Sequence, residues 1–357
     1  MSGDVRVGFI GSGFARRVQL PGLALVPGTT PVAISSGHRA NAEAVARDFQ
    51  LPLVFDDGIE LARSPDVDLV IVSSTPDAHA RYAIAALEAG KHVLCEKPMA
   101  IDAFEAAQMV AASEQHPDSI AWIDHELRYE PNRRRARELI RSNALGELRH
   151  IELSLKPYLR GDGRPQAADA PWTWWFDAAR GGGILGAVGS HLIDLCRFWC
   201  GSEIRYVAGL AETFVKQRKD EAGQAQPVTA DDFSSCVLQP ASGVIATITL
   251  STVAQHGPGH LGQVTGSEGT LLLSGETKLE FGKGGGGPLE DISAPDDLWE
   301  QTKPNNMWAR SFVRLMREMI HVIRGGTPHG EPATFRDGWQ VQRVLDAVRS
   351  ARGVRLD

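Results

Sequence analysis

A pair of glycines near the N-terminus has the spacing of a phosphate-binding turn. Gly11 and Gly13 come after the apolar run Val5 to Ile10 and before a helical pattern that starts with Phe14 and Ala15. Glycine at such a strand-to-helix turn lets backbone N–H groups approach a pyrophosphate. The third position of the G-x-G-x-x-G/A fingerprint holds an arginine, so the prediction of a dinucleotide site also rests on the strand-first, N-terminal context. The alternative is a turn that uses glycine for its geometry alone.

The end of the second expected strand predicts which dinucleotide binds. The carboxylate that would accept hydrogen bonds from the adenosine ribose is missing, and the chain has Ser35, Ser36 and Arg39 instead. Hydroxyl and guanidinium groups can donate hydrogen bonds to a 2′-phosphate. We therefore expect NADP as the cofactor in preference to NAD. The alternative is that these three residues only begin the next helix.

A lysine at the end of the fifth expected strand is a candidate for acid–base chemistry. Lys97 lies beyond the run His92 to Cys95, at the edge where parallel α/β sheets bind ligands, and Pro98 restrains its backbone. An ammonium group at this position can polarise a hydroxyl or a carbonyl oxygen. The alternative is a solvated lysine that closes a strand.

A histidine in the second half of the chain is the other candidate for acid–base chemistry. His191 follows a glycine-rich stretch, and the ordinary pKa of histidine lies near neutral pH. Such a group can act as a general base and take a hydroxyl proton while a hydride leaves the same carbon. The alternative is a buried histidine that packs a helix. Asp194, three residues later, either faces the same side or hydrogen-bonds only within the helix.

Two further stretches carry side chains that suit a polyhydroxylated ligand. Aromatic rings can cover the C–H faces of a sugar, and Arg and His can donate hydrogen bonds to its hydroxyls. The first stretch follows the sixth expected strand and contains His125, Arg128 and Tyr129. The second contains Trp174 and Trp175, just before a triple glycine. For each tryptophan, packing in the core is the alternative.

The first third of the chain must position the glycine pair and the lysine. It alternates short apolar runs with helical patterns, as parallel βαβ units do. A helix over 101–115 is expected to bury Phe104 and Val110 on one face. The expected strands are Val5 to Ile10, Val32 to Ser35, Leu53 to Phe55, Leu69 to Ser73, His92 to Cys95 and Ile120 to Ile123.

From about residue 149 the pattern changes to longer alternating runs, such as Val244 to Leu250, which predict antiparallel strands. A helix-bearing insertion is expected over 184–200, and two helices are expected over 309–324 and 335–351. The sequence thus predicts an N-terminal Rossmann domain with a doubly wound parallel sheet, residues 1–124, of the α/β class. It also predicts a C-terminal α+β domain, residues 125–357, built on a large, mainly antiparallel open sheet for substrate binding and oligomerisation.

Composition excludes several classes of partner. The formal net charge of -7, from 37 basic and 44 acidic residues, gives no concentrated positive field, so nucleic acid is not expected. No run approaches the roughly 18 apolar residues of a membrane span. The four cysteines lack the spacing of a zinc site, so we expect reduced thiols, no metal and a cytoplasmic location.

Five segments form an ordered set of motifs along the chain. They read STPDAH at 74–79, GKHVLCEKP at 90–98, GGG at 181–183, GSHLID at 189–194 and ATFRDG at 333–338. The set resembles the glucose-fructose oxidoreductase/inositol dehydrogenase (Gfo/Idh/MocA) family, and Glu96-Lys97-Pro98 is its most specific element. This resemblance spans nearly the whole chain.

The resemblance implies a Rossmann domain, an open-sheet domain, a nicotinamide cofactor and a sugar, polyol or related hydroxyl substrate. Members usually have an aspartate one helical turn before the histidine, where this chain has Ala187, so an orienting carboxylate is missing. The loops after the fourth and fifth strands are expected to supply further cofactor contacts: Ser74, Thr75, Pro76, His79, Glu96 and Lys97.

These residues predict an oxidoreductase that transfers a hydride between NADP(H), or NAD(H), and a secondary hydroxyl or ketone of a carbohydrate-like molecule. One alternative is a redox-neutral enzyme that uses transient oxidation for elimination, epimerisation or glycoside cleavage. Another is a non-catalytic regulatory protein that binds the cofactor, which the alanine at position 187 keeps open and the retention of Lys97 and His191 argues against. Because an open sheet face needs a cover, we expect a homodimer or homotetramer.

Overall fold

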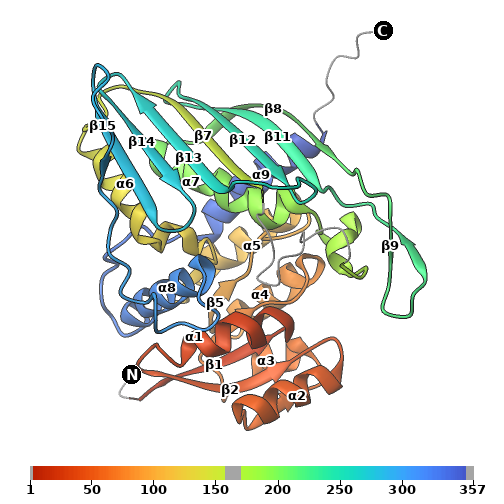
Figure 1. Cartoon of the computed structure of the whole chain (residues 1–357). Coiled ribbons are helices and arrows are strands. Elements are labelled where there is room, and N and C mark those ends of the chain that lie inside the picture. Colours follow the sequence, from red (N-terminus) through yellow and green to blue (C-terminus); the bar gives the residue numbers. More distant parts are fainter. Residues whose placement is uncertain (1–2, 157–169, 351–357) are drawn as a thin grey trace. The chain divides into compact units, whose positions relative to one another are not determined.

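The computed structural model describes residues 3–156 and 170–350 of the chain. By its internal contacts the chain divides into two compact units (Figure 1). The first unit consists of Met1–Glu130 and Asp296–Trp339, and the second of Pro131–Pro295 and Gln340–Asp357. A stretch from late in the chain therefore belongs to the first unit.

The first unit is built on a six-stranded parallel sheet in the order β3-β2-β1-β4-β5-β6. The strand order changes direction between β1 and β4, which creates the switch point where doubly wound sheets bind ligands. The predicted Rossmann fold is therefore confirmed. The strands are β1 (Val5–Ile10), β2 (Thr29–Ser35), β3 (Leu53–Phe55), β4 (Leu69–Val72), β5 (His92–Cys95) and β6 (Ala121–Ile123).

Helices cover both faces of this sheet, because successive strand residues point to opposite sides. Val7 and Phe9 pack in one apolar cluster, and Ile10 packs in the other. The helices of the first unit are α1 (Leu20–Leu23), α2 (Arg39–Phe49), α3 (Gly58–Arg63), α4 (His79–Glu88), α5 (Ala103–Gln115) and α8 (Met307–Ile323). Helix α8 follows the second unit in sequence, yet Phe312, Met316 and Ile320 complete the cluster around Val7.

The apolar face predicted for α5 was wrong at Phe104 and right at Val110. Phe104 is 71% exposed, whereas Ala106, Met109 and Val110 are buried. The side chain of Asp102 caps the helix by accepting a hydrogen bond from the Glu105 N–H at 2.8 Å. The helix has apolar residues on two neighbouring stripes. The stripe with Ala106 and Met109 packs in the core, and Phe104 lies outside it.

The second unit contains a mixed, mainly antiparallel sheet of eight strands in the order β16-β15-β14-β13-β7-β12-β11-β8, which confirms the prediction. Strands β7 and β12 form its parallel pair. A separate hairpin, β9 (Gln217–Lys219) with β10 (Ala225–Pro227), was not expected. The strands of the large sheet are β7 (Leu148–Lys156), β8 (Ile204–Glu212), β11 (Phe233–Pro240), β12 (Ile245–Ser251), β13 (Gly259–Gly266), β14 (Gly269–Ser274), β15 (Lys278–Lys283) and β16 (Glu290–Asp291).

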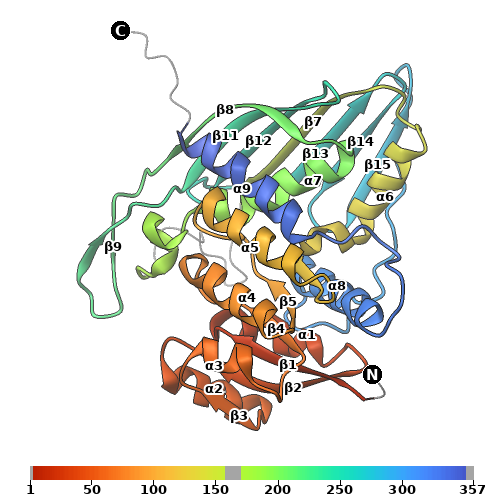
Figure 2. The same ribbon diagram turned by 180° about the vertical axis from the view of Figure 1, so that it is seen from behind.

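One face of the large sheet carries α6 (Pro131–Arg141) and α7 (Ser190–Cys200), as Figure 2 shows from behind. Along β12, Ala246 and Ile248 are buried while Ile245 is exposed, so the strand alternates between the two faces. The exposed face carries several large apolar side chains: Tyr206, Leu210, Val237, Ile245 and Leu261.

Short helical turns connect these elements. The 3-10 helices include η2 (Pro76–Ala78), η3 (Glu126–Tyr129), η4 (Trp174–Phe176) and η5 (Ala178–Arg180), and the π-helices are η1 (Ala15–Gln19) and η6 (Leu185–Gly189). Helix α9 (Phe335–Ser350) ends the described part of the chain. Within the ranges that the structure describes, none of the helices has the length and apolar character needed to cross a membrane.

Candidate functional site

The predicted phosphate-binding turn joins β1 to η1. Its two glycines are needed for different reasons. Gly11 has a φ of +111°, and a Cβ atom on it would lie 2.3 Å from the carbonyl oxygen of Ser73. The close approach of the β1 and β4 ends therefore requires glycine at this position. A Cβ atom on Gly13 would meet no protein atom within 4 Å. Gly13 thus presents open backbone at a helix start, which fits a pyrophosphate. Phe14 and Ala15 continue this turn into η1.

The residues predicted to select the adenosine half lie at the ends of β2 and α2. The Ser36 hydroxyl lies 3.0 Å from the Ser12 hydroxyl, and Ser35 is 1% exposed. Arg39 donates from Nε to Glu43 at 2.8 Å and from Nη1 to Asp56, which follows β3. The structure thus brings Ser36 and Arg39 to one edge. Sequence reasoning missed Asp56, which is a competitor for the guanidinium.

A buried histidine ties the loop after β4 to the loop after β5. The ring nitrogens of His79 lie 3.0 Å from the carbonyl oxygens of Ser74 and Pro98. Burial lowers the pKa of His79, and its contacts with the backbone carbonyls oppose this shift. The Ala78 N–H donates to the Thr75 carbonyl at 2.9 Å, and Pro76 begins η2. These predicted contact residues therefore shape the switch-point edge of the sheet.

Glu96 and Lys97 follow β5 at the same edge. Glu96 is 7% exposed, and its carboxylate accepts hydrogen bonds from Gln19 Nε2 at 2.9 Å and from the Lys97 backbone N–H at 3.2 Å. The hydroxyl of Ser73 donates to the Gln19 amide oxygen. Gln19 is the last residue of η1, so the glycine turn and the lysine loop are joined by one hydrogen-bonded chain. Sequence reasoning missed Gln19, a polar residue between Val18 and Leu20.

Two further carboxyl groups lie beside Glu96. Asp124 is 1% exposed and Glu126 is 2% exposed. We refer to Glu96, Asp124 and Glu126 as the carboxyl cluster. Burial raises the pKa of each member, to about 8 for Glu126, while the positive charge of Lys97 opposes the shift. The cluster therefore retains a proton near neutral pH.

The three residues predicted to bind substrate after β6 differ in their surroundings. The Arg128 guanidinium donates to the Glu331 carbonyl and to Asp337 Oδ1, each at 3.1 Å. Tyr129 packs in the apolar cluster that contains α8. His125 is 1% exposed. Arg128 and Tyr129 thus fasten the late part of the chain to the first unit.

His191 lies in the first turn of α7, in the second unit, and its side chain is buried. The preceding π-helix η6, which contains Ala187, starts where Asp231 Oδ2 accepts a hydrogen bond from the Leu185 N–H at 2.7 Å. The Asp231 carbonyl accepts another from the Ile184 N–H at 3.0 Å. Asp231, which sequence reasoning missed, therefore fixes the start of the segment that presents His191.

Asp194 lies on α7 and is held by a neighbour. Its Oδ1 is 3.4 Å from Arg197 Nη1, three residues further along the helix. Arg197 also makes a bidentate pair with Glu203, at 2.8 Å and 2.7 Å. This arrangement places Asp194 in an ion-pair network within the second unit.

The two predicted tryptophans form η4 in the second unit. Their ring centroids are 6.1 Å apart with an interplanar angle of 60°. The Trp175 carbonyl accepts a hydrogen bond from the Gly183 N–H at 3.0 Å, so Trp174 and Trp175 lie against the triple glycine before His191. The structure therefore joins the tryptophans to the His191 segment, while Lys97 belongs to the first unit.

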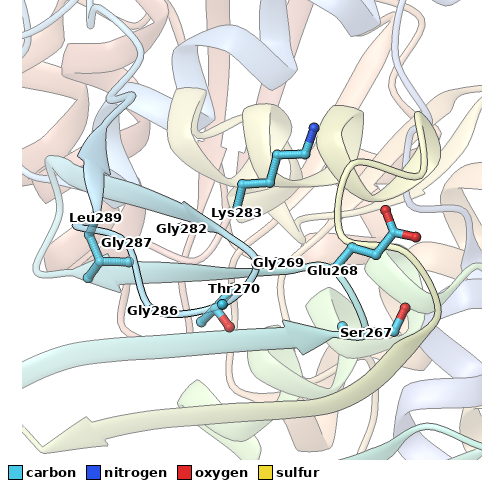
Figure 3. A pocket seen from close by; sticks show the side chains of 12 residues that line it. Ser267, Glu268, Gly269, Thr270, Gly282, Lys283, Gly286, Gly287 and Leu289 are labelled. Atoms are coloured by element: carbon cyan, nitrogen blue, oxygen red, sulfur yellow. The ribbon is translucent and has the colours of Figure 1, made fainter.

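A surface pocket of about 280 Å³ lies at the turns that follow β13 and β15 (Figure 3). None of the predicted site residues lines it. Ligand sites usually combine apolar walls with a few convergent polar groups, which this glycine-rich surface lacks. The lining residues are Gly266, Ser267, Glu268, Gly269, Thr270, Gly282, Lys283, Gly284, Gly285, Gly286, Gly287 and Leu289.

Comparison with known proteins gives matches over both units. Residues 5–124 match the family model described as oxidoreductase family, NAD-binding Rossmann fold, and residues 133–272 match the GFO/IDH/MocA C-terminal domain. An uncharacterized oxidoreductase of Synechocystis sp. is 30% identical over 362 residues, which covers 98% of this chain and 94% of the relative.

Two solved structures show the same architecture over nearly the whole chain. The oxidoreductase domain protein from Kribbella flavida has a TM-score of 0.85 at 27% identity, with 97% of this chain and 96% of that chain covered. Levoglucosan dehydrogenase in complex with NADH and L-sorbose has a TM-score of 0.85 at 23% identity, with the same coverage of 97% and 96%.

Proposed function

Because the chain belongs to the Gfo/Idh/MocA oxidoreductase family, we propose that it transfers a hydride between NADP(H), or NAD(H), and a secondary hydroxyl or ketone of a sugar, polyol or related compound. The observation that carries this proposal is the shared edge of the first sheet. Strands β1, β4 and β5 are parallel, so the open backbone at Gly13 and the side chain of Lys97 follow strand ends on one edge. When bound, the nicotinamide would accept or supply the hydride.

Each candidate residue has a distinct role in this proposal. Lys97 orients the substrate oxygen and stabilises negative charge that develops on it. His191 takes or returns the hydroxyl proton as the general base or acid. Trp174, Trp175 and His125 contribute to the substrate pocket. The fold accommodates such ligands, since levoglucosan dehydrogenase binds NADH and L-sorbose.

The cofactor preference belongs to the same proposal. The strand β2 ends without a carboxylate, and Ser36 and Arg39 follow it with groups that can donate to a phosphate, which supports a 2′-phosphate site at this strand end. Because Arg39 is paired with Asp56 and Glu43, the phosphate has to replace Asp56 as the partner of the guanidinium. We propose that NADP(H) binds more tightly than NAD(H).

The proposal extends to the oligomeric state, the partner and the location of the protein. The exposed apolar face of the large sheet, which includes Tyr206, Leu210 and Val237, supports a homodimer or homotetramer through that face. A small molecule is the expected partner, and the net charge of -7 argues against nucleic acid. The cytoplasmic location expected from the sequence stays a proposal.

One structural observation supports a second candidate function. Ala187 replaces an expected carboxylate near His191, and Asp194 is already paired with Arg197. A protein that binds the cofactor and a sugar without net turnover, as a regulator, would tolerate that loss. Redox-neutral catalysis through transient oxidation would also leave no net change in the cofactor.

The decisive experiment incubates the purified protein with NAD or NADP and a panel of sugars and polyols. Absorbance of the reduced nicotinamide and product identification are followed together. Net reduction of the cofactor supports the dehydrogenase. A changed sugar without cofactor reduction supports the redox-neutral enzyme, and cofactor binding without either supports the regulator. Loss of turnover in Lys97→Ala, with cofactor binding retained, would place the lysine in the reaction.

A further inference from the structure

The helical turn before His191 is held by a carboxylate to which the proposed reaction gives no role. We propose that Asp231 is a positioning residue for that reaction: it holds the π-helix η6 in its wide form, and η6 sets the direction in which His191 points. This inference rests on the proposed function, because it takes His191 as the general base or acid.

The segment η6 makes a wider turn than an α-helix does. The N–H of Ser190 donates to the carbonyl of Leu185, five positions earlier, which is the hydrogen bond of a π-helix. In an α-helix the same N–H would donate to the carbonyl of Gly186. The backbone is right-handed helical at Ile184 and at Ser190, so η6 and α7 form one continuous helix with a single wide turn. Such turns are rare and often occur at functional sites.

The wide turn determines the orientation of His191, which lies in the first turn of α7. Each residue of an α-helix rotates the chain by about 100° and advances it by about 1.5 Å. Conversion of η6 to an α-helical turn would shift α7 by one residue relative to the start of η6, so the His191 side chain would rotate by about 100° around the helix axis. A misplacement of about 1 Å can cost a reaction about 100-fold in rate. The form of η6 therefore controls whether the imidazole can reach the substrate hydroxyl.

Asp231 binds two backbone N–H groups at the start of η6. Its Oδ2 accepts a hydrogen bond from the Leu185 N–H at 2.7 Å, and its backbone carbonyl accepts one from the Ile184 N–H at 3.0 Å. The first N–H groups of a helix have no partner within the helix, so an outside acceptor can fix where the helix begins. Leu185 is also the residue whose carbonyl accepts the π-helical bond. Asp231 therefore acts on the wide turn itself.

Two glycines make room for these contacts. Gly183 has a φ of +104°, and a Cβ atom on it would lie 2.2 Å from Asp231 Oδ1. Glycine is therefore required here if the carboxylate is to reach η6. At the other end of η6, a Cβ atom on Gly189 would lie 3.0 Å from Cδ1 of Leu250, near the end of β12. The wide turn thus packs closely between Asp231 and β12.

The large sheet fixes the position of Asp231. The next residue, Asp232, donates its N–H to the carbonyl of Glu212 at the end of β8, and its carbonyl accepts the N–H of Thr252 beyond β12, both at 2.9 Å. Asp231 therefore carries the position of the sheet to η6. A carboxylate at position 187 could orient the imidazole from one helical turn away, but the chain has Ala187 there. We therefore assign the orienting part to the backbone that Asp231 holds.

The test compares Asp231 with its neighbour. The Asp232 carboxylate also binds two backbone N–H groups, those of Phe214 and Val215 at 2.8 Å each, but neither belongs to η6. Asp231→Ala and Asp232→Ala thus each remove a carboxylate that holds backbone, and only the first should affect His191. Asp231→Asn keeps an acceptor oxygen and is the rescue variant. If Asp231→Ala does not fold, Asp231→Glu takes its place, because it displaces the carboxylate by one methylene group.

Steady-state kinetics give the first readout, with NAD⁺ or NADP⁺ and the sugar or polyol of the panel that the wild-type protein oxidises fastest. Asp231→Ala should lower kcat by about 100-fold and leave KM and the Kd of the cofactor nearly unchanged, because only the base is displaced. Asp231→Asn should recover most of kcat, and Asp232→Ala should keep the wild-type value. Urea denaturation should show a similar loss of stability in the two alanine variants.

A second readout does not depend on turnover. The ring nitrogens of His191 are observed by ¹⁵N NMR and assigned by their loss in His191→Ala. Their chemical shifts report the tautomer and the surroundings of the imidazole. The signals should move in Asp231→Ala and keep their positions in Asp231→Asn and Asp232→Ala.

The possible failures are distinguishable. Wild-type kcat in Asp231→Ala overturns this inference alone, and so do His191 signals that stay in place in that variant. An equal loss of kcat in Asp232→Ala also overturns it, since the effect would then come from a general loosening of the second unit. If the wild-type protein turns over no member of the panel, the proposed function fails first and this inference falls with it.

Discussion

The two ends of the first sheet hold their polar groups in opposite ways. At the β2 and β3 end, Arg39 forms ion pairs with Glu43 and Asp56 whose side chains are all at least 44% exposed. At the β5 and β6 end, the carboxyl cluster is buried, and no member is more than 7% exposed. Exposed ion pairs contribute little to stability and exchange partners readily, whereas buried hydrogen-bonded groups are costly to disturb.

This difference in exposure suggests different roles for the two ends of the sheet: cofactor selection at the exposed end and the proposed reaction at the buried end. In the proposed function, a phosphate replaces Asp56 at the exposed end, and exposed ion pairs such as this one cost little to exchange. The buried end has its groups preset, because Glu96 is fixed by Gln19 and by the Lys97 backbone. A preset group needs no rearrangement during a reaction, which is the general requirement for electrostatic catalysis.

The largest effect is expected at the glycine turn between these ends. Gly13→Val should abolish cofactor binding while changing the free energy of unfolding by less than about 1 kcal/mol, because its Cβ meets no protein atom. Gly11→Val should instead destabilise the fold by more than about 3 kcal/mol, because it meets the Ser73 carbonyl. Circular dichroism with urea and calorimetry measure the two quantities. Full cofactor affinity in Gly13→Val would show that the pyrophosphate binds elsewhere.

The next largest effect is expected on turnover, when Lys97 at the buried end or His191 in the second unit is replaced. Lys97→Ala should lower kcat and raise KM together, because the ammonium orients the substrate oxygen and stabilises its charge. His191→Ala should lower kcat by about 10²- to 10⁴-fold with cofactor affinity unchanged, as expected for a general base. Steady-state kinetics on a substrate from the sugar panel decide this, with Lys97→Arg as the charge-preserving control. Full activity of His191→Ala would assign the base to another residue.

A smaller effect is expected at the exposed end. Arg39→Ala should weaken NADP(H) binding by about 10- to 100-fold and leave NAD(H) binding nearly unchanged, as for one lost charge-assisted hydrogen bond. Asp56→Asn should strengthen NADP(H) binding, since it frees the guanidinium, and Glu43→Gln provides the comparison. Calorimetric titration with both cofactors gives the answer. Equal losses for the two cofactors, or an initial preference for NAD(H), would refute the assignment of the 2′-phosphate site.

The smallest effect is expected in the pH dependence of the free energy of unfolding. The folded-state pKa of Glu126, about 8, exceeds its value in the unfolded chain, so the folded state binds the extra proton between about pH 4.5 and 8. The free energy of unfolding should therefore fall as the pH rises through this window, by at most about 1.4 kcal/mol per pH unit. Urea denaturation from pH 5 to 9 measures the slope, which should be reduced in Glu126→Gln. An equal slope in that variant would mean that Glu126 is ionised in the folded protein.

Local patterns predicted the strands of the first sheet because each buried strand is a continuous apolar run. The bounds of β1, β3 and β5 agree with the predicted ones. The pattern of α5 failed since two apolar stripes occur on one helix, and only the packed structure shows that Phe104 faces solvent. The hairpin of β9 and β10 carries polar residues without alternation, so nothing in its sequence marked it as strand.

The candidate site was only partly visible in the sequence for a related reason. Gly11, Gly13 and Lys97 occur at fixed places relative to strands, so local context identified them. Gln19 contacts Glu96 across 77 positions of the chain, and no local pattern encodes that contact. It depends on the π-helical turn η1, in which a wider backbone spiral redirects the side chain.

Helix α8 has a consequence for how the protein is made. It supplies Phe312, Met316 and Ile320 to the core around β1, but the ribosome produces it only after the stretch Pro131–Pro295. Synthesis of that stretch takes on the order of ten seconds. During that time one apolar face of the nascent Rossmann sheet lacks its cover, so the first unit begins to fold first and is completed late. A fragment that ends before Asp296 would keep this face exposed permanently, which makes it a substrate for chaperones and prone to aggregation.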